Sequence, residues 1–211
     1  MDFLSLRKDM VQSQLVSRGI KCARVLEAFM KIERHLFVPA SRIEQAYADH
    51  PVQIGQAQTI SQPYITALMV ELLEINKDDC VLEIGTGSGY QSAILAQLAK
   101  EVFTIERIES IATNAKDLLN KLGYSNVTVI TGDGTMGYKE KGCFDKIIVS
   151  AASPEIPQPL LDQLKQGGRM VIPLGDKAIQ TINVVIKNLK IECRPSCACV
   201  FVPLVGRFGF N

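Results

Sequence analysis

From residue 80 onward, short apolar runs alternate with segments of helical periodicity. Runs at 81–84, 102–105, 127–130, 146–149 and 169–173 have the length and composition of buried strands. The segments 91–100, 108–122 and 157–164, which lie between these runs, carry apolar residues at helical spacing. This alternation predicts a mainly parallel sheet with helices on both faces. Runs 179–187 and 197–204 have no helix between them, so we expect them to pair antiparallel.

The first 75 residues are expected to form a helical extension. Phe3, Leu6 and Met10 lie at helical spacing, and apolar positions within 25–32 indicate a second helix. Residues 35–39 are expected to be extended. His35, within this segment, is expected to have a packing or capping role. The segment 49–64 is too polar for a core element and is expected to be irregular.

Another helix is expected to follow that irregular segment. Ser61 is placed to cap it, and Pro63 suits its first turn. Its buried face is predicted from the i, i+3, i+4, i+7 spacing of Ile65, Leu68, Met69 and Leu72.

Composition favours one domain over the whole chain, residues 1–211, with a helical and substrate-loop region at 1–75 and an α/β core at 76–211. Hydrophobic residues make up 47% of the chain, which suffices for a large core. The net charge of +1 gives no polyanion-binding field, and we expect no nucleic-acid partner. The start lacks the layout of a signal peptide and no apolar run could span a bilayer, so a cytoplasmic location is expected.

The six cysteines are expected to be reduced and to have no metal. Three of them cluster at Cys193, Cys197 and Cys199, but the spacing fits no zinc pattern. The two histidines, His35 and His50, lie far from this cluster in sequence.

The run at 81–84 leads directly into a glycine loop, residues 85–89, which reads Gly85, Thr86, Gly87, Ser88 and Gly89. Strand, glycine loop and helix form a ligand site, because glycine permits close backbone approach and the helix start supplies unpaired N–H groups. The dinucleotide fingerprint G-x-G-x-x-G does not fit, since Tyr90 stands at its third glycine. G-x-G-x-G after Glu83 resembles motif I of S-adenosylmethionine-dependent methyltransferases. A turn without a ligand is the alternative.

Acidic residues at the ends of the predicted strands complete the expected cofactor site. Glu106 can accept hydrogen bonds from both ribose hydroxyls, because a carboxylate has two oxygens. Asp133, followed by Gly134, can accept from the adenine amino group, or can form an Asx turn instead. Glu83 lies near the amino end of the cofactor or only supports the loop. Because ligands bind beyond the carboxyl ends of parallel strands, these segments are expected to share one crevice.

Several further segments resemble one methyltransferase family, in the same chain order. They are residues 34–39, 59–64, 132–134, 154–157, 167–169 and 201–205. With motif I, the set resembles the protein-L-isoaspartate (D-aspartate) O-methyltransferases over nearly the whole chain. Thr-Ile-Ser-Gln-Pro at 59–63 is more specific to this family than motif I, which many methyltransferases share.

The resemblance implies a Rossmann-like methyltransferase sheet with added N- and C-terminal elements. It implies methyl transfer from S-adenosyl-L-methionine, which leaves S-adenosyl-L-homocysteine, to the free α-carboxylate of isoaspartyl residues in damaged proteins. The methyl ester would then collapse to succinimide. It implies that Ser61 is the active-site hydroxyl and that its neighbour Ile60 binds substrate. It also implies that Val202, Pro203 and Leu204 present backbone to the substrate peptide.

The residue set suits this reaction. A carboxylate is ionised at neutral pH, since its unperturbed pKa is about 4, so its methylation needs no general base. Alignment and desolvation are then the expected tasks of the protein. Ser61 could donate to the substrate carboxylate, or act as an ordinary helix cap, or do both.

Two other functions are compatible with a glycine loop. One is methylation of a small molecule or a nucleic acid, although residues 150–154 carry no Asn-Pro-Pro-Tyr-type motif and no basic–aromatic patch is present. The other is a non-enzymatic nucleotide-binding module. Isoaspartyl proteins and peptides are the expected partners, with no membrane and no obligate partner.

Overall fold

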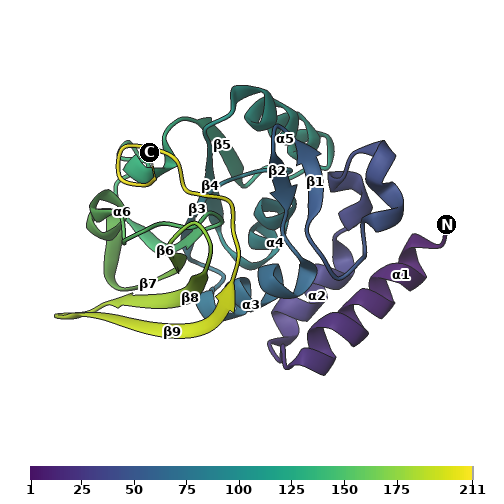
Figure 1. Ribbon diagram of the computed structural model, residues 1–211, viewed down its shortest axis with the longest axis horizontal. Helices are drawn as coiled ribbons and strands as arrows, with labels where there is room; N and C mark the ends of the chain where they lie inside the picture. Colours follow the sequence, from purple (N-terminus) through teal and green to yellow (C-terminus); the bar gives the residue numbers. More distant parts are fainter. Residues whose placement is uncertain (211) are drawn as a thin grey trace.

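The computed structural model describes residues 1–210, which form one large sheet, a small hairpin and six α-helices (Figure 1). The sheet has the order β5-β4-β3-β6-β7-β8-β9. Its strands are β3 (Cys80–Ile84), β4 (Glu101–Glu106), β5 (Val127–Thr131), β6 (Phe144–Val149), β7 (Leu164–Gly175), β8 (Gln180–Lys187) and β9 (Ile191–Cys199). Strands β3 to β7 are parallel, and β8 and β9 are antiparallel. The predicted fold class is therefore confirmed.

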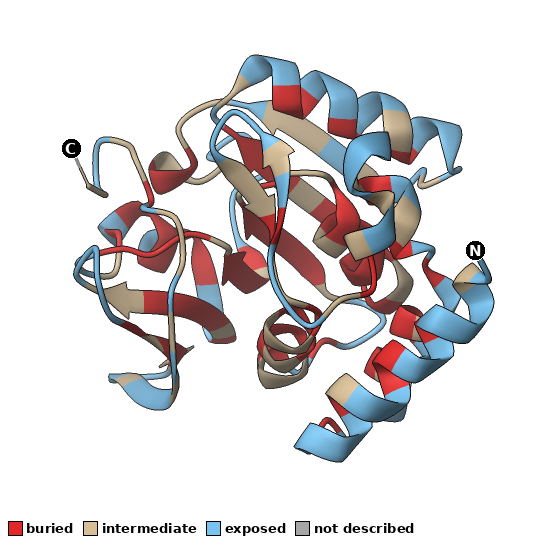
Figure 2. Ribbon diagram, turned by 45° about the vertical axis from the view of Figure 1, so that its right-hand side comes forward, coloured by how far each residue is buried: buried red, intermediate tan, exposed pale blue. Residues whose placement is uncertain are grey.

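Burial on both faces explains why the central strands are apolar throughout. Every residue of β3 is buried, and β4 and β6 flank it in register. One core cluster joins Val81, Val102 and Ile148 to the helices α2 (Ala23–Lys31), α3 (Pro63–Leu73) and α4 (Tyr90–Leu98). A second cluster joins the opposite strand face to α6 (Gln158–Gln163). Buried residues accordingly line the strands and the inner helix faces in Figure 2.

The strand order reverses at β3, because β4 continues on one side of it and β6 lies on the other. Helix α4 follows β3, and α5 (Glu109–Lys121) follows β4. A reversal of this kind opens a crevice at the carboxyl ends of the strands. The glycine loop stands at the end of β3, at this crevice.

The N-terminal extension is helical, as predicted. Helix α1 (Phe3–Asp9) continues through a π-helical turn and a 3₁₀ turn to Arg18 and stops at Gly19. The expected extended piece at 35–39 is wrong, because Arg34–Phe37 forms a 3₁₀ turn. The His35 ring stacks on Phe3 with ring centroids 3.8 Å apart, and its Nδ1 lies 2.9 Å from the Tyr47 hydroxyl. His35 therefore has a packing role.

The segment before α3 is more regular than predicted. It forms an antiparallel hairpin of β1 (Val52–Gly55) and β2 (Gln58–Ile60), whose tip holds Gln56 and Ala57 at positive φ. Gln62, and not Ser61, is the N-cap residue of α3, and its side chain makes no capping bond. The fully buried face of α3 is centred on Thr66, Met69, Val70 and Leu73, while Ile65, Leu68 and Leu72 are only partly buried.

The last strand also differs from its predicted bounds. Strand β9 ends at Cys199, and residues 200–204 leave the sheet edge and run over the end of β6. Ala152 accepts from the Leu204 N–H at 2.7 Å and donates its own N–H to the Val202 carbonyl at 2.8 Å. Pro203, which lacks an N–H, is placed between these bonds. No helix of the described residues is long and apolar enough to cross a membrane.

Candidate active site

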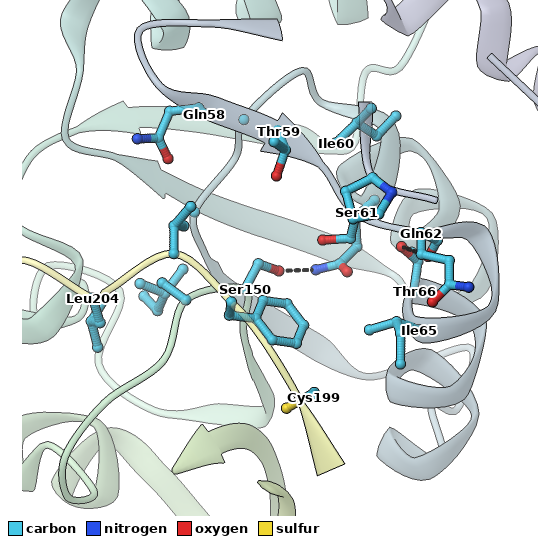
Figure 3. A pocket seen from close by; sticks show the side chains of 18 of the residues that line it. Gln58, Thr59, Ile60, Ser61, Gln62, Ile65, Thr66, Ser150, Cys199 and Leu204 are labelled. Atoms are coloured by element: carbon cyan, nitrogen blue, oxygen red, sulfur yellow. Dashed lines mark hydrogen bonds between the residues drawn. The ribbon is translucent and has the colours of Figure 1, made fainter. Parts of the chain in front are cut away.

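A cavity of about 780 Å³ lies at the carboxyl ends of β3, β4 and β6. Its walls come from three parts of the chain: the glycine loop with the end of β4, the substrate loop (residues 60–62) with the start of α3, and residues 197–205. Figure 3 shows side chains of the second and third parts, such as Ser61 and Leu204, with Ser150 around one space. The predicted site residues that line it are Ile60, Ser61, Gly85, Thr86, Gly87, Ser88, Glu106, Gly134, Val202, Pro203 and Leu204.

Three predicted residues lie behind the wall and not on it: Glu83, Gly89 and Asp133. Gly89 has φ +84° and begins α4, with the side chain of Leu119 at 3.2 Å from the place of an added Cβ. Glycine at this position thus serves the turn and its packing against α5.

Glu106 is the acidic residue that faces the cavity. Its side chain is buried, and Oε2 accepts from the Gly87 N–H at 3.1 Å. Oε1 accepts from the Ile108 N–H, also at 3.1 Å. Each carboxylate oxygen has a second lone pair, so the group can still accept two hydrogen bonds from a ligand. This is the acceptor that the cis hydroxyls of a ribose require.

Glu83 is fully buried behind the glycine loop. Its carboxyl group is hydrogen-bonded to the Ser92 hydroxyl and accepts from the Gln91 amide at 3.0 Å. The same amide donates to the Ser150 hydroxyl at 2.7 Å, which is the dashed bond at Ser150 in Figure 3. Burial raises the pKa of Glu83 to about 7, against the lowering effect of these bonds. Two roles are predicted for Glu83, contact with the cofactor and support of the loop. Its contacts within the described residues match the second role.

Asp133 has protein partners for both oxygens. Oδ1 accepts from the Thr135 N–H at 2.9 Å and from its hydroxyl at 2.7 Å, which is an Asx turn. Oδ2 accepts from the Arg207 N–H at 2.8 Å. Burial acts to raise the pKa of Asp133, but these hydrogen bonds outweigh it and hold the pKa below its usual value. The structure thus matches the Asx-turn alternative, and contact with adenine stays a prediction.

Ser61 stands just before the first turn of α3. Its side chain is half-buried at the cavity wall, and its hydroxyl makes no hydrogen bond within residues 1–210. The first turn of α3 contains Pro63 and has no side-chain cap, so the N–H groups of Tyr64 and Ile65 lack intrahelical partners. A hydroxyl and a helix N-terminus at one wall form a site for an anionic oxygen.

The C-terminal wall offers little free backbone. The Val202 carbonyl and the Leu204 N–H are both bonded to Ala152, and the Leu204 carbonyl accepts from the Phe210 N–H at 2.7 Å. The Val202 N–H and the Pro203 carbonyl are the groups of this segment left for a peptide.

Several lining residues were not predicted. Arg18 comes from the N-terminal extension, with its guanidinium 3.7 Å from the centre of the Tyr64 ring. Gln91, Ser150 and the residues from Cys197 to Phe201 also line the cavity. Of these, Ser150 has a usable sequence signal, because it directly follows the predicted strand 146–149, and Gln91 has a weaker one as the first residue of the predicted helix after the glycine loop.

The donors and acceptors of the cavity fit S-adenosylmethionine. The loop backbone lines the cavity at Gly85 and Gly87, which both have positive φ, and the Glu106 carboxylate is the predicted ribose acceptor. Ile84 and Ile105 provide apolar wall, as an adenine ring requires. The opposite wall contains Ser61 and residues 202–204, the segments predicted to contact the methyl acceptor.

A sequence profile of the protein-L-isoaspartate(D-aspartate) O-methyltransferase family matches residues 6–209. The chain belongs to this family. The predicted family is thus confirmed, and with it the enzyme class: an S-adenosylmethionine-dependent methyltransferase that acts on isoaspartyl residues of damaged proteins.

Relatives and solved structures agree with this membership. The methyltransferase is 52% identical to the protein-L-isoaspartate O-methyltransferase of Petrotoga mobilis, over 100% of both chains. It is 51% identical to protein-L-isoaspartate O-methyltransferase 1 of Syntrophobacter fumaroxidans, over 100% of this chain and 99% of the other.

A solved protein-L-isoaspartate O-methyltransferase has a TM-score of 0.87 at 28% identity, with 96% of this chain and 67% of that chain covered. A structure from Plasmodium falciparum, titled as a complex with S-adenosyl-L-homocysteine, has a TM-score of 0.82 at 24% identity, over 97% and 99% of the two chains. These structures support the fold of the methyltransferase.

Proposed function

We propose that the cavity holds S-adenosylmethionine at Glu106 and the glycine loop, and the isoaspartyl peptide at Ser61 and residues 202–204. The observation that carries the proposal is that Ser61 and Glu106 line one continuous cavity, although they come from separate parts of the chain. In this arrangement residues 1–75 supply the substrate loop, and residues 76–211 supply the cofactor half of one functional unit.

When bound, S-adenosylmethionine supplies an electrophilic methyl group on a positively charged sulfur. The acceptor carboxylate is already ionised, so no side chain has to remove a proton from it. Ser61 donates its hydroxyl hydrogen to one carboxylate oxygen, and the N-terminal N–H groups of α3 stabilise the same negative charge. The other oxygen is left to attack the methyl carbon.

Alignment and exclusion of water are the main contributions of the chain. Charge is neutralised as the methyl group moves, so the reaction is favoured where water is scarce. Ile60, Ile65 and Leu204 provide apolar wall on the substrate side. In-line transfer needs reacting atoms about 3–3.5 Å apart, which the peptide-binding wall has to secure.

An isoaspartyl residue routes its main chain through the side-chain carboxyl, so its α-carboxylate stands on a shorter stem than that of ordinary aspartate. A wall that grips the flanking backbone therefore places the two carboxylates at different depths. The ester product next loses methoxide, which leaves as methanol, when the following backbone nitrogen attacks the ester carbon. That step forms succinimide and needs no group of this enzyme.

The test is a labelled-methyl assay on paired peptides that differ only in isoaspartate or aspartate at one position. We expect label in the isoaspartyl peptide, little or none in the other, and release of the label in alkali. Equal labelling, or alkali-stable label on nitrogen, would overturn the proposal. The cytoplasmic location, the reduced state of the cysteines, and the lack of nucleic-acid and obligate partners remain predictions from the sequence.

A further inference from the structure

Arg34 is a fully buried, positively charged side chain close to the active site. It belongs to the 3₁₀ turn Arg34–Phe37 of the N-terminal extension, and its relative exposure is 0%. Its Nε donates to the Ala46 carbonyl at 2.7 Å, and its Nη2 donates to the Ser61 carbonyl at 2.8 Å. Among residues 1–210, no carboxylate forms an ion pair with it.

A buried guanidinium without an acidic partner is costly, since desolvation is offset only by its hydrogen bonds. Here the hydrogen-bonding is also incomplete, because neither Nη1 of Arg34 nor the hydroxyl of Tyr90 has a partner within the described residues. An apolar residue would fill this space at lower cost. The position of the guanidinium between two walls of the cavity suggests what it contributes.

The guanidinium lies between the substrate loop and the glycine loop. On one side it bonds to the main chain of Ser61. On the other side its Cζ is 4.7 Å from the centre of the Tyr90 ring, and Tyr90 is the first residue of α4, directly after the glycine loop. The ring is itself held by Phe29 and Phe37 in edge contacts. Arg34 thus contacts both the segment that carries Ser61 and the helix that begins at the cofactor loop.

We propose that Arg34 is a positioning residue for methyl transfer, which sets the spacing between the Ser61 main chain and the Tyr90 ring. A fork of several donors on a planar group can bond two carbonyls and lie over a ring at once, whereas a lysine ammonium cannot do all three. Arg34 has no contact with the substrate in this proposal. It aligns the wall that orients the carboxylate with the wall that holds the methyl donor, and a misplacement of about 1 Å costs roughly 10²-fold in rate.

The test compares Arg34→Lys with the wild-type enzyme on an isoaspartyl peptide. We expect kcat at saturating cofactor to fall by about tenfold or more, while calorimetry shows S-adenosylhomocysteine affinity within about threefold of wild type. Arg7→Met is the matched control, because Arg7 is a buried arginine of the same extension whose ion-pair partner is Glu33. This control should lower the melting temperature and leave kcat per folded molecule unchanged.

Removal of a buried guanidinium can unfold a protein, so Tyr90→Leu serves as a second variant. It keeps both carbonyl bonds of Arg34 but removes the ring, and the same loss of kcat is expected. The double variant should lose no more than the larger single loss, because both changes break one link. Unchanged kcat in folded Arg34→Lys, or in Tyr90→Leu, would overturn the inference.

The inference rests on the proposed function, and the two can fail separately. Equal methylation of aspartyl and isoaspartyl peptides by the wild-type enzyme would reject the proposed function. Selective methylation by the wild type together with an unaffected Arg34→Lys variant would reject the role of Arg34 alone.

Discussion

The Gly87 backbone N–H donates to Oε2 of Glu106 at 3.1 Å, so the glycine loop and the cavity-facing carboxylate hold one another in place. The loop follows β3 and the carboxylate ends β4, two neighbouring parallel strands. Their pairing brings both groups to one edge of the sheet. The carboxylate proposed to accept from the ribose is therefore fixed in position by the protein before a ligand arrives.

Replacement of Glu106 should weaken cofactor binding without loss of the fold. A buried acceptor for ligand hydroxyls contributes about 1–3 kcal/mol, so Glu106→Ala should raise the Kd for S-adenosylhomocysteine about tenfold or more. Titration calorimetry measures this directly. Glu101→Ala is the control, since Glu101 begins the same strand and its side chain pairs with Lys141 at the surface. Equal affinity of the Glu106 variant and the wild type would rule out the ribose role.

Ser61 can now be tested as a catalytic group with little interference from helix capping. The N-cap residue of α3 is Gln62, so Ser61→Ala should not carry the loss of about 1 kcal/mol that removal of a capping serine causes. We expect a nearly unchanged melting temperature and a fall in kcat of about tenfold or more, as for a lost charge-assisted hydrogen bond. Ser61→Thr should retain part of the rate. Parallel losses of kcat and thermal stability would argue against a role in turnover.

The fold and the broad placement of the cofactor site could be predicted because their signals are local. The strand at 81–84 is an unbroken apolar run, and its buried surroundings require that pattern. Because ligands bind beyond the carboxyl ends of parallel strands, the glycines and acidic residues at those ends are expected to share one site. The same rule does not predict which way a carboxylate points. The tertiary structure decides this, and of the three carboxylates only Glu106 lines the cavity, while Glu83 and Asp133 lie behind its wall.

The side of the cavity with Ser61 and residues 200–204 is harder to predict from the sequence, because it depends on contacts between distant segments. The hairpin β1–β2 turns through Gly55, Gln56 and Ala57, all at positive φ. Glycine suits such a conformation, but glutamine and alanine rarely adopt it, so the sequence gives only a weak turn signal there. Residues 200–204 look like a strand, but they cross to Ala152 instead. In the sequence, Arg34 is only one residue of a family motif. Its contacts with Ser61 and Tyr90 arise in the tertiary structure and cannot be predicted from that motif.

Glu83 should make stability depend on pH near neutrality. Its folded-state pKa of about 7 lies above the usual value of 4.5, so between these values the folded chain keeps a proton that the unfolded chain has lost. Stability from this group is therefore complete below pH 4.5 and is lost as the pH rises to 7. The difference corresponds to about 3 kcal/mol as an order of magnitude.

Glu83→Gln removes this dependence. The amide oxygen of glutamine can accept from Gln91, as the carboxyl group does. Its NH₂ group can donate to the Ser92 hydroxyl oxygen, whereas in the wild type that hydroxyl donates to the carboxyl group. Denaturant unfolding at several pH values should show that the free energy of unfolding of the variant increases relative to that of the wild type as the pH rises from 5 to 8. A constant difference between the two proteins over this range would mean that Glu83 does not hold its proton in the folded state.

The contacts of Asp133 predict that its carboxylate secures the C-terminal segment. It accepts from the Arg207 N–H, and the carboxylate packs so closely on Gly206 that a Cβ there would collide with it. The segment also donates the Phe208 N–H to the Thr135 hydroxyl at 3.1 Å, next to the Asx turn of Asp133. Asp133→Ala removes the acceptor of the Arg207 N–H, and a hydrogen bond to a charged group is worth about 1.5–3 kcal/mol. It also removes the Asx turn that positions Thr135. The segment 206–209 should then detach more often.

Trypsin cleavage after Arg207 reports that detachment, because a protease needs the local chain to open. We expect cleavage to be about tenfold faster or more in Asp133→Ala than in the wild type. Asp145→Ala is the matched control, since this carboxylate also accepts a backbone N–H, that of Cys80 at 2.9 Å, but its side-chain partner is Lys165 and not a residue of the segment 206–209. Calorimetry on the same variant separates the two roles of Asp133. An unchanged cleavage rate with a large loss of S-adenosylhomocysteine affinity would favour an adenine contact, because a carboxylate that had turned toward the ligand could not be the group that holds Arg207.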